Sequence, residues 1–534
     1  MKKRRPPMPK SRRPVSAAAA QANATRLMTA FALHQQGALD QAEKLYQEIL
    51  HSQPQHLDAL QLLARVALQQ KKFTLAIELF DRALKINPHD PSAFCNRGIA
   101  LLELKRYDEA LESYDRTLRL NPDDADAFYS RGNALLALKR HEDALESYDQ
   151  VLKIKPDYPG ALNNSGNALL ALGRPEEALE SYGRALKFKL DCAGLLHNCG
   201  KALLALNRHA EALDNYAHAL RLKPDYADAH WNESLCRLLL GDFALGWQKH
   251  EWRLKSPQVD ASKNFQQPLW LGEAPLAGKT LLLHAEQGLG DTLQFCRYAP
   301  LAAAQGARVV LAVPSALKVL CQTLADVDTL LAIGDPLPPF DFHAPLMSLP
   351  LAFGTRLDSI PAEVPYLHAD SEKTAAWNIL LGPRDKPRVG LAWSGRPTHK
   401  NDHNRSLPFA LLAGLLEYPA EFICLQKEFH HEDEALARQH SRMRIFSEQL
   451  QDFADTAALI ETLDLVITID TSVAHLAGAL GKPVWILLPF APDWRWLLDR
   501  GDSPWYPSAR LFRQQQLGQW APVLAEVRRA LHEI

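Results

Sequence analysis

The sequence predicts a helical solenoid followed by an α/β region that is built as two halves. The first half of the chain repeats itself at a step of 34 residues, and from residue 277 short apolar segments alternate with helical stretches. The alternation comes in two sets, separated by an irregular segment at 361–370. A chain of 534 residues is too long for a single hydrophobic core, so several domains are expected.

The repeat is visible in columns of small and aromatic residues. An alanine recurs at a step of 34, and an aromatic residue follows each one four positions later, at Tyr46, Phe80, Tyr114, Tyr148, Tyr182 and Tyr216. Glycines mark a second fixed small position, and a proline closes most units. Each unit should therefore be a pair of closely packed helices that ends at the proline. The pattern resembles the tetratricopeptide repeat, with a seventh, degenerate unit at 229–254.

One polar column also follows the repeat. Asparagine recurs two residues before the small position, at Asn96, Asn164, Asn198 and Asn232. Asparagine is a poor helix former, so its repeated use inside helices needs a reason. In the O-linked N-acetylglucosamine transferases, which carry similar asparagines, this ladder holds the backbone of an extended protein substrate. We expect an acceptor-protein groove here; a solvated helix face or helix caps would explain the column as well.

The second half of the chain reads as parallel β-sheets covered by helices. Its apolar segments are 280–284, 308–313, 329–333, 340–344, 388–393, 421–425, 465–469 and 484–488. Alternation of such strands with helices is typical of Rossmann-like folds. Two halves of this kind leave a cleft at the carboxyl ends of the strands, where ligands bind.

These patterns divide the chain into five parts. We expect a disordered basic tail (1–24), the repeats (25–255), a linker (256–276), an N-terminal acceptor-side half (277–370) and a C-terminal nucleotide-sugar half with a closing helix (371–534). Outside the basic tail the chain is mildly acidic, which argues against a nucleic-acid partner. No apolar run is long enough to span a membrane.

The seven cysteines are scattered and form no paired motif. Such a set suggests buried thiols in a reducing compartment, so a cytoplasmic location is expected.

A glycine-rich loop follows the first strand of the α/β region. Its sequence, HAEQGLGDTLQFCRY (284–298), lacks the third glycine of a dinucleotide fingerprint and the lysine of a phosphate-binding loop. Gln287, Gly288 and Gly290 are candidate acceptor-loop residues. Asp291, with Gln294 three positions later, fits a capping box, which alone would explain it; it could also serve as the base that takes a proton from an acceptor hydroxyl.

A second segment, LVITIDTSVAH (465–475), is a strand followed by a helix start. Asp470, Thr471, Ser472 and His475 converge there, and a helix N-terminus with two hydroxyls is suited to a diphosphate. A well-capped helix with a buried histidine is the alternative. We interpret the segment as the main donor-binding site.

Other candidate donor-binding residues lie in two further segments. Ser394, Lys400 and Arg405 belong to an irregular stretch at 391–408, and Gln426 and Lys427 follow the strand at 421–425. A solvated loop would explain the first stretch almost as well. The acidic pairs at 326–328 and the run at 430–434 are weak as metal ligands, so no metal and no cofactor is expected beyond a nucleotide-sugar co-substrate.

Together these segments resemble glycosyltransferase family nine, the ADP-heptose:lipopolysaccharide heptosyltransferases, which have the GT-B fold. The resemblance implies that Asp291 is the base and that the 470–475 segment binds the donor diphosphate. Repeats followed by such a pair of halves resemble the O-linked N-acetylglucosamine transferases and the bacterial flagellin-modifying enzymes, in which a lysine like Lys427 contacts the donor phosphate. The stretch FAPDWRWLLDR (490–500) departs from the heptosyltransferase pattern, as does Ser472, where those enzymes usually have glycine.

The resemblance implies an inverting, metal-independent transfer of a hexose or heptose to a protein hydroxyl. Two alternatives stay open: the same chemistry on a lipopolysaccharide or other glycan, and a non-catalytic repeat scaffold with a silent GT-B module. The sequence does not identify the sugar, the nucleobase, the acceptor, the oligomeric state or the role of the basic tail.

Overall fold

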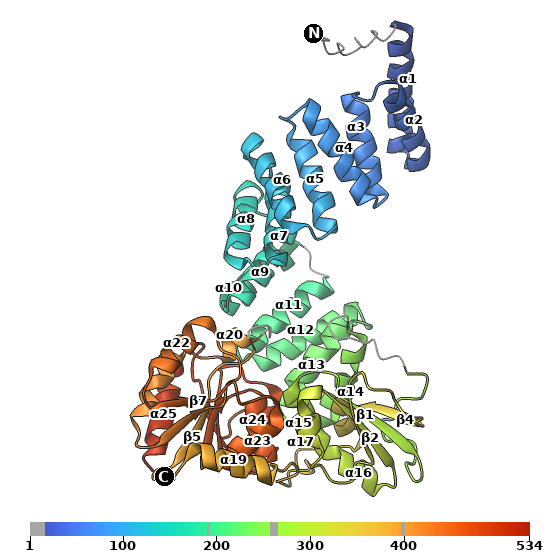
Figure 1. Ribbon diagram of the computed structural model, residues 1–534. Helices are drawn as coiled ribbons and strands as arrows, with labels where there is room; N and C mark the ends of the chain where they lie inside the picture. Colours follow the sequence, from blue (N-terminus) through green and yellow to red (C-terminus); the bar gives the residue numbers. More distant parts are fainter. Residues whose placement is uncertain (1–16, 189–191, 257–264, 397–400, 534) are drawn as a thin grey trace, which may run out of the picture. The chain divides into compact units, whose positions relative to one another are not determined.

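The chain forms two compact units, residues 1–190 and 191–534. The computed structural model describes residues 17–188, 192–256, 265–396 and 401–533. The boundary between the units falls inside the repeats (Figure 1), so the last two helix pairs belong to the same unit as both β-sheets.

The first unit consists of five consecutive helix pairs in its described residues. Their bounds are α1 (Ala17–Gln35), α2 (Leu39–Ser52), α3 (Leu57–Gln69), α4 (Phe73–Ile86), α5 (Pro91–Glu103), α6 (Tyr107–Leu120), α7 (Ala125–Ala137), α8 (His141–Ile154), α9 (Pro159–Ala171) and α10 (Pro175–Phe188). Helix α1 begins at Ala17, inside the segment that we expected to be disordered, because an alanine-rich stretch favours helix.

The glycine and tyrosine columns explain why the helices of a pair pack so closely. A Cβ atom on Gly98 would lie 2.6 Å from the ring of Tyr114, and on Gly132 it would lie 2.5 Å from the ring of Tyr148. These tyrosines are fully buried. Glycine is therefore required at these positions, as it is at Gly166 and Gly200, where a Cβ would clash with the rings of Tyr182 and Tyr216.

The turn inside each pair also repeats. One residue per pair adopts the left-handed conformation, at Gly37, Lys71, Lys105, Lys139, Gly173, Asn207 and Gly241. A left-handed residue after a helix ends it and reverses the chain. The step of 34 residues is thus set by backbone geometry as well as by packing.

The second unit begins with two more helix pairs. These are α11 (Ala193–Ala205) with α12 (His209–Leu222) and α13 (Ala227–Leu239) with α14 (Phe243–His250), followed by the 3₁₀ helix η1 (Glu251–Lys255). In the last pair Gly246 takes the place of the usual alanine, because a Cβ there would lie 2.6 Å from Leu238.

The N-terminal α/β half holds a four-stranded parallel sheet in the order β3-β2-β1-β4. The strands are β1 (Thr280–His284), β2 (Arg308–Val313), β3 (Thr329–Ala332) and β4 (Phe342–Pro345), and the helices are α15 (Leu289–Phe295), η2 (Cys296–Tyr298), α16 (Ala299–Ala304), α17 (Ser315–Cys321), η3 (Leu346–Ser348) and α18 (Leu349–Ala352). Part of the expected linker belongs to this half, since Leu269 forms a bridge with His343 and Trp270 is buried.

The C-terminal half holds a six-stranded parallel sheet in the order β10-β9-β8-β5-β6-β7. The strands are β5 (Arg388–Ala392), β6 (Glu421–Cys424), β7 (Met443–Ile445), β8 (Leu465–Ile469), β9 (Val484–Leu488) and β10 (Ala509–Arg513). The helices are α19 (Ser371–Leu381), α20 (Asp402–Arg405), α21 (Phe409–Leu412), η4 (Ala413–Glu417), α22 (His431–Gln439), α23 (Phe453–Glu461), α24 (Ser472–Ala479), η5 (Trp494–Trp496) and α25 (Trp520–Leu531).

The fold class predicted from the sequence, a helical solenoid followed by an α/β region with two parallel sheets, is confirmed. The eight expected strands are present within a few residues of their predicted bounds. Sequence reasoning missed β7 and β10, which lie at the two edges of the second sheet. β7 has only three residues, and β10 carries Arg510 and Arg513, so neither has a strong apolar pattern.

Candidate functional site

The strand order of the second sheet marks one position for a ligand. Successive strands are added to one side of β5 and then, from β8 onward, to its other side. In open α/β sheets, ligands bind at the carboxyl ends of the two strands where the order reverses. The segments that leave β5 and β8 are those that carry most of the candidate donor-binding residues.

At the end of β8, Thr471 is the N-cap of α24. Its hydroxyl oxygen accepts a hydrogen bond from the Val473 N–H at 3.3 Å, and Ser472 opens the helix. Thr471 and Ser472 are only partly buried. This end of α24 therefore combines the positive end of a helix dipole with two hydroxyl groups, as an anion site requires.

Asp470 precedes this helix and carries an unusual charge environment. Burial and the neighbouring carboxylate of Asp493 raise its pKa to about 6, against the opposing effect of Arg405 and Arg495. Arg405 also donates to the Asp470 backbone carbonyl oxygen at 3.0 Å. Carboxylates and guanidinium groups are thus concentrated at one strand end, a common feature of functional sites.

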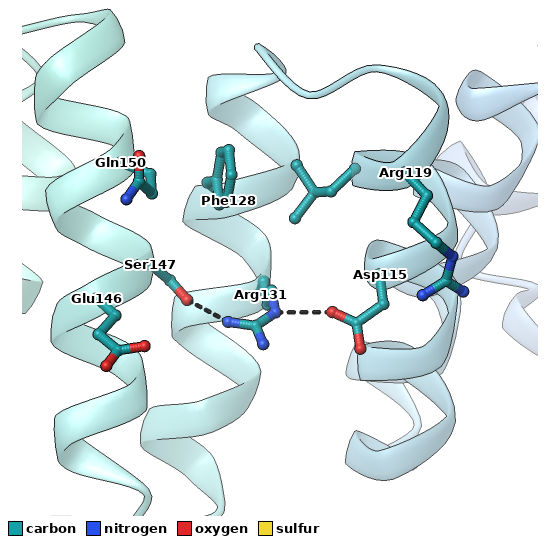
Figure 2. Close-up of a pocket in the computed structure, with 8 residues that line it drawn as sticks. Asp115, Arg119, Phe128, Arg131, Glu146, Ser147 and Gln150 are labelled. Carbon is teal, nitrogen blue, oxygen red and sulfur yellow. Dashed lines mark hydrogen bonds and ion pairs between the residues drawn. The ribbon is translucent and has the colours of Figure 1, made fainter.

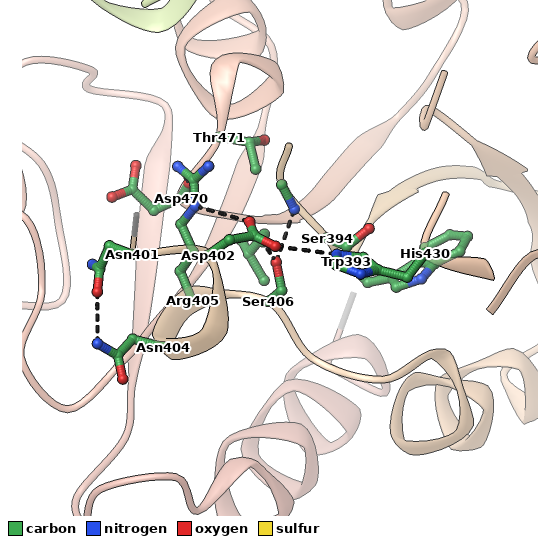
Figure 3. Close-up of polar contacts among 12 residues, drawn as sticks. Trp393, Ser394, Asn401, Asp402, Asn404, Arg405, Ser406, His430, Asp470 and Thr471 are labelled. Carbon is green, nitrogen blue, oxygen red and sulfur yellow. Dashed lines mark hydrogen bonds and ion pairs between the residues drawn. The ribbon is translucent and has the colours of Figure 1, made fainter. Parts of the chain in front are cut away.

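The segment after β5 folds into a polar network around Asp402 (Figure 3). Asp402 accepts hydrogen bonds from Ser406 at 2.9 Å and from Arg405 at 3.4 Å, and its other oxygen lies 3.1 Å from a ring nitrogen of His430. The buried Asp402 therefore fixes Arg405 beside Asp470. Lys400 lies outside the described residues.

The side chains of two candidate donor-binding residues, Ser394 and Gln426, are hydrogen-bonded to each other. Gln426 accepts from the Trp393 and Ser394 N–H groups at 2.7 and 2.6 Å and donates to the Ser394 hydroxyl at 2.7 Å. Both side chains are buried, with 8% and 4% exposure. Their evident role is to join the ends of β5 and β6. Lys427 is exposed, and its ammonium group donates to the Gln451 carbonyl at 2.7 Å.

The glycine-rich loop of the N-terminal half meets this region through α15. Gly288, not Asp291, is the N-cap of α15, and the Asp291 carboxylate accepts a hydrogen bond from the Gly288 N–H at 2.8 Å. The expected capping box is therefore shifted by three residues, because Asp291 supplies its returning carboxylate. Gln287 is exposed.

Gly290 is a contact between the two halves. A Cβ on Gly290 would lie 2.7 Å from His475 Cδ2, so only glycine allows α15 and α24 to pack at this point. His475 is buried, with Nδ1 at 2.9 Å from the Tyr506 hydroxyl and its ring stacked on Trp496. Burial, with Arg495 nearby, holds the pKa of His475 well below its ordinary value, so its ring is neutral.

Sequence reasoning missed Arg495, which lies between the halves. Its buried guanidinium group forms ion pairs with Asp291 of the first half and with Asp493 of the second, and it also donates to Gln294. The cleft expected here is therefore filled at this point by side chains. The signal in the sequence was a charged residue between two tryptophans, in the stretch that departs from the heptosyltransferase pattern.

A second buried arginine ties the last repeat to the glycine-rich loop. Arg253 of η1 is fully buried and pairs with Glu286 through two nitrogens, at 2.6 and 3.1 Å. It also donates to Glu251 at 2.7 Å and to Ser348 at 2.8 Å. Burial raises the pKa of Glu286, although Arg253 opposes that shift. A bidentate pair of this kind fixes the loop before Gly288.

In the first unit, the asparagine column takes part in contacts within and between helices. Asn96 donates to the Ser92 carbonyl of its own helix at 2.9 Å. Asn164 donates to Asn133 of the preceding first helix at 2.8 Å. Asn164 also donates to the Tyr129 hydroxyl at 3.3 Å and accepts from Asn163 at 3.0 Å, so both its amide nitrogen and its oxygen take part in contacts inside the protein. Both asparagines are partly exposed.

The second unit repeats this arrangement at its own asparagines. The Asn232 amide lies 2.7 Å from the His197 Nε2, one pair earlier. Asn198 is partly buried on α11. The groove assignment therefore stays a prediction.

The first unit also carries two equivalent pockets, 34 residues apart. Arg131 lines one of about 370 Å³, where its guanidinium group donates to Asp115 at 2.8 Å and to Ser147 at 2.7 Å (Figure 2). The other, of about 380 Å³, has the same arrangement around Arg97. Each arginine charge is already balanced by a carboxylate.

Within the described ranges, no group of three or more histidine, cysteine, aspartate or glutamate side chains is arranged to hold a metal ion. Asp328 of the acidic pair accepts from the Val309 N–H at 2.7 Å, and Asp433 of the acidic run accepts from Trp393 and Phe409. No helix among the described residues is long and apolar enough to cross a membrane.

Family models match the repeats. Tetratricopeptide-repeat models cover residues 95–159, 135–196 and 200–232, and the model for anaphase-promoting complex, cyclosome, subunit 3 covers residues 35–117. The helix pairs are tetratricopeptide repeats. Repeats of this kind serve protein–protein contacts through their extended surfaces.

Among curated proteins, the chain is similar to Protein FlbA of Caulobacter vibrioides. The two are 30% identical over 324 residues, which is 55% of this chain and 53% of FlbA. The chain thus spans about half the length of the curated relative that it matches.

Several solved structures are similar to part of the chain. MamA is 23% identical, with a TM-score of 0.31 over 32% of this chain and 92% of that one. YrrB, described as a TPR protein with an unusual peptide-binding site, is 22% identical, with a TM-score of 0.30 over 34% of this chain and 92% of its own. PilF of Pseudomonas aeruginosa is 21% identical, with a TM-score of 0.35 over 39% of this chain and 96% of its own.

Proposed function

We propose that the chain is an inverting, metal-independent glycosyltransferase that moves a sugar from a nucleoside-diphosphate sugar to a hydroxyl group of a protein. One observation carries the proposal. The carboxylate of Asp291 pairs with Arg495, whose charge also interacts with Asp470, the residue before the N-cap of α24, and α15 itself packs against α24. An acid–base group opposite an anion site is what such a transfer needs.

The reaction forms one bond and breaks one. The oxygen of the acceptor hydroxyl attacks the anomeric carbon, and the bond from that carbon to the β-phosphate oxygen breaks on the opposite face, which inverts the configuration. The electron pair leaves with the nucleoside diphosphate, and the hydroxyl proton passes to the Asp291 carboxylate.

The second half would stabilise the negative charge that develops on the diphosphate. The N-terminus of α24, the hydroxyls of Thr471 and Ser472 and the fixed guanidinium group of Arg405 supply donors without a metal ion. Lys400 and Lys427 are further candidates for stabilising the negative charge on the diphosphate. Ser394 and Gln426 would act indirectly, by holding the strand ends that carry these groups.

The tetratricopeptide repeats favour a protein as the acceptor. A protein glycosyltransferase must hold an extended segment of its acceptor, and a row of partly exposed asparagines such as Asn96 places amide groups on the repeats that could bond to a peptide backbone. A glycan acceptor would make no evident use of so long a solenoid.

The first test is turnover by the purified chain with a panel of nucleoside-diphosphate sugars. Asp291→Asn should reduce transfer by about 10²–10⁴-fold, the usual worth of a general base. Asp358→Asn is the matched control, because Asp358 is an exposed aspartate of the same half. Wild-type turnover by Asp291→Asn would reject the base assignment.

A non-catalytic scaffold is the second candidate, and one observation favours it. Both oxygens of Asp291 are already engaged, one by the Gly288 N–H and one by Arg495. Binding of a nucleoside diphosphate with no hydrolysis or transfer from any donor of the panel would support the scaffold.

Mass spectrometry would identify the acceptor. Proteins from cells with and without this chain should differ by a sugar mass on serine or threonine if the acceptor is a protein. A difference confined to glycans, with unmodified proteins, would support the glycan alternative.

A further inference from the structure

The segment 490–500, here termed the bridging loop, joins the parts of the second unit. Trp494 packs edge-on against Trp247 of α14, with ring centroids 5.2 Å apart. Arg495 pairs with Asp291 of the N-terminal half, and Trp496 stacks on His475 of α24. Three consecutive residues therefore contact the repeats, the candidate base and the candidate donor helix.

The conformation of the bridging loop is imposed by its surroundings. Leu497 has a φ of +51°, which is unfavourable for a residue with a side chain. Arg513 of β10 donates to the carbonyls of Trp496, Leu497 and Arg500, at 2.6, 3.0 and 3.0 Å. Burial lowers the pKa of Arg513 to about 10, which still leaves it charged at neutral pH.

The repeats hold the other end of this loop. Asn207, in the left-handed turn of its helix pair, donates to the Phe490 carbonyl at 2.7 Å. Backbone strain that is maintained by several tertiary contacts tends to occur at functional sites. We therefore looked to the side chain at the centre of the loop for a role in ligand binding.

The carboxylates around Arg495 carry more negative charge than its guanidinium group balances. Asp291 and Asp493 pair with it directly, and the carboxylate of Asp470 also interacts with it. Arg405 is the other guanidinium group beside Asp470. A diphosphate brought to the N-terminus of α24 would meet these carboxylates, and it would be repelled unless Arg495 turned toward it.

We propose that Arg495 is a donor-binding residue that exchanges partners. In the donor-free protein it pairs with Asp291, and when a nucleoside-diphosphate sugar binds, its guanidinium group pairs with the diphosphate instead. This exchange rests on the proposed function. It frees one oxygen of Asp291 for the acceptor hydroxyl only after the donor has bound.

The exchange of partners by Arg495 has two measurable consequences. Donor and acceptor should bind in a fixed order, with the donor first. Asp291 should also weaken donor binding, because it competes with the diphosphate for Arg495.

The experiment measures the affinity of the full-length chain for ADP, GDP, UDP and CDP by calorimetry. Arg495→Gln should lower the affinity for the diphosphate that binds best by at least about tenfold, the usual cost of losing one charge-assisted hydrogen bond. Arg495→Lys should recover part of the affinity, since it keeps the charge. Asp291→Asn should bind the diphosphate several-fold more tightly while its transfer activity falls.

Arg500→Gln is the matched control. Arg500 lies in the same loop and pairs with an aspartate, Asp502, but away from Asp291. It should bind the diphosphate like the wild type, and melting temperatures of all variants separate lost binding from lost folding.

The outcomes are distinguishable. Equal affinity in the wild type, Arg495→Gln and Asp291→Asn would overturn the exchange and leave the proposed transferase standing. A wild-type chain that binds none of the four diphosphates and turns over no nucleotide sugar would overturn the proposed function, and the exchange with it.

Discussion

Gly290 lies so close to His475 that no side chain fits between them. In the sequence its glycine could be explained by a bound phosphate, by a tight turn or by close packing. The contact between α15 and α24 favours the last explanation, because the approaching atom belongs to the opposite half. The glycine is a condition for the two halves to meet at the candidate site.

Gly290→Ala should destabilise the protein by about 1–3 kcal/mol through overpacking. Gly194→Ala is the control, since it lies in helix α11 with open space around it, and alanine there should be neutral or stabilising. Thermal unfolding of the two variants checks the difference. Equal melting temperatures would show that α15 and α24 adjust to the extra methyl group.

Asp470 is expected to cost stability at neutral pH. Its pKa is raised from the ordinary 3.8 to about 6, so the protonated form favours the folded state. That favourable contribution is complete below about pH 4 and is lost as the pH rises through 6. Above pH 6 the charged Asp470 carboxylate lowers the stability of the folded state, as is common at functional sites.

Asp470→Asn should therefore raise the stability at pH 7–8 by roughly 1–3 kcal/mol while reducing activity. Denaturant unfolding at pH 4 and at pH 7.5 is the measurement, and the gain should vanish at pH 4. A variant that is less stable than the wild type at pH 7.5 would contradict the charge environment derived for this residue.

At the scale of elements, helix α14 and the 3₁₀ helix η5 are joined by aromatic rings. Trp247, Trp494 and His250 pack together, and Trp247 also donates to the Thr355 carbonyl at 3.0 Å. His250 is buried with neither ring nitrogen hydrogen-bonded to another described residue. Burial, with Arg253 and Arg495 nearby, holds its pKa well below the ordinary value.

A histidine that stays neutral in the folded state makes stability depend on pH in a definite direction. The contribution of neutral His250 to folding stability is complete above pH 6.5. It is lost as the pH falls below that value, because His250 binds a proton in the unfolded chain but not in the folded one. His250→Phe should remove up to about 1.4 kcal/mol per pH unit of this dependence between pH 6.5 and 5.

Melting curves across this range provide the measurement, with the exposed His532→Gln as the control. The control should show the same dependence of stability on pH as the wild type. An unchanged slope in His250→Phe would mean that other groups cause the loss of stability in acid.

At the scale of the whole molecule, the unit boundary falls between helix pairs and not at the end of the repeats. The last pair, α13 and α14, shares its core with the α/β region, through Phe243, Trp247 and Trp505. Arg253 adds a buried ion pair between η1 and the glycine-rich loop. Repeats contact mainly their neighbours, so the first unit can be removed with limited effect on the second.

A fragment of residues 191–534 should accordingly unfold cooperatively and bind nucleoside diphosphates like the full chain. A fragment of residues 231–534 should be far less stable, because it lacks α11, α12 and the first turn of α13. Circular dichroism melting and calorimetry compare the two. Equal stability would show that the last repeats are dispensable for the α/β core.

Much of this architecture could be predicted because its causes are local. The spacing of Gly98, Gly132 and their partner tyrosines reflects contacts inside one helix pair. The apolar runs of β1 and β8 are buried whatever their neighbours are, so their bounds were predicted to the residue. The helix start at Thr471 was also predictable, since a helix N-terminus after a strand is a local feature.

The candidate site was predictable only in part. Asp291, Thr471 and Arg405 stay predictions as site residues, whereas the side chains of Ser394 and Gln426 are hydrogen-bonded to each other. Arg495 was missed because its partners lie 204 and 201 residues away, at Asp291 and Gln294.

The sequence by itself determined the periodic solenoid, the two parallel sheets and the strand ends that carry polar residues, since each follows from residues close together in the chain. Only the tertiary structure decided which of those residues meet: that Gly290 abuts His475, that Arg495 bridges Asp291 and Asp493, and that the last helix pair shares the α/β core. The physical reason is that ion pairs and steric contacts depend on distance in space, which a linear pattern does not encode.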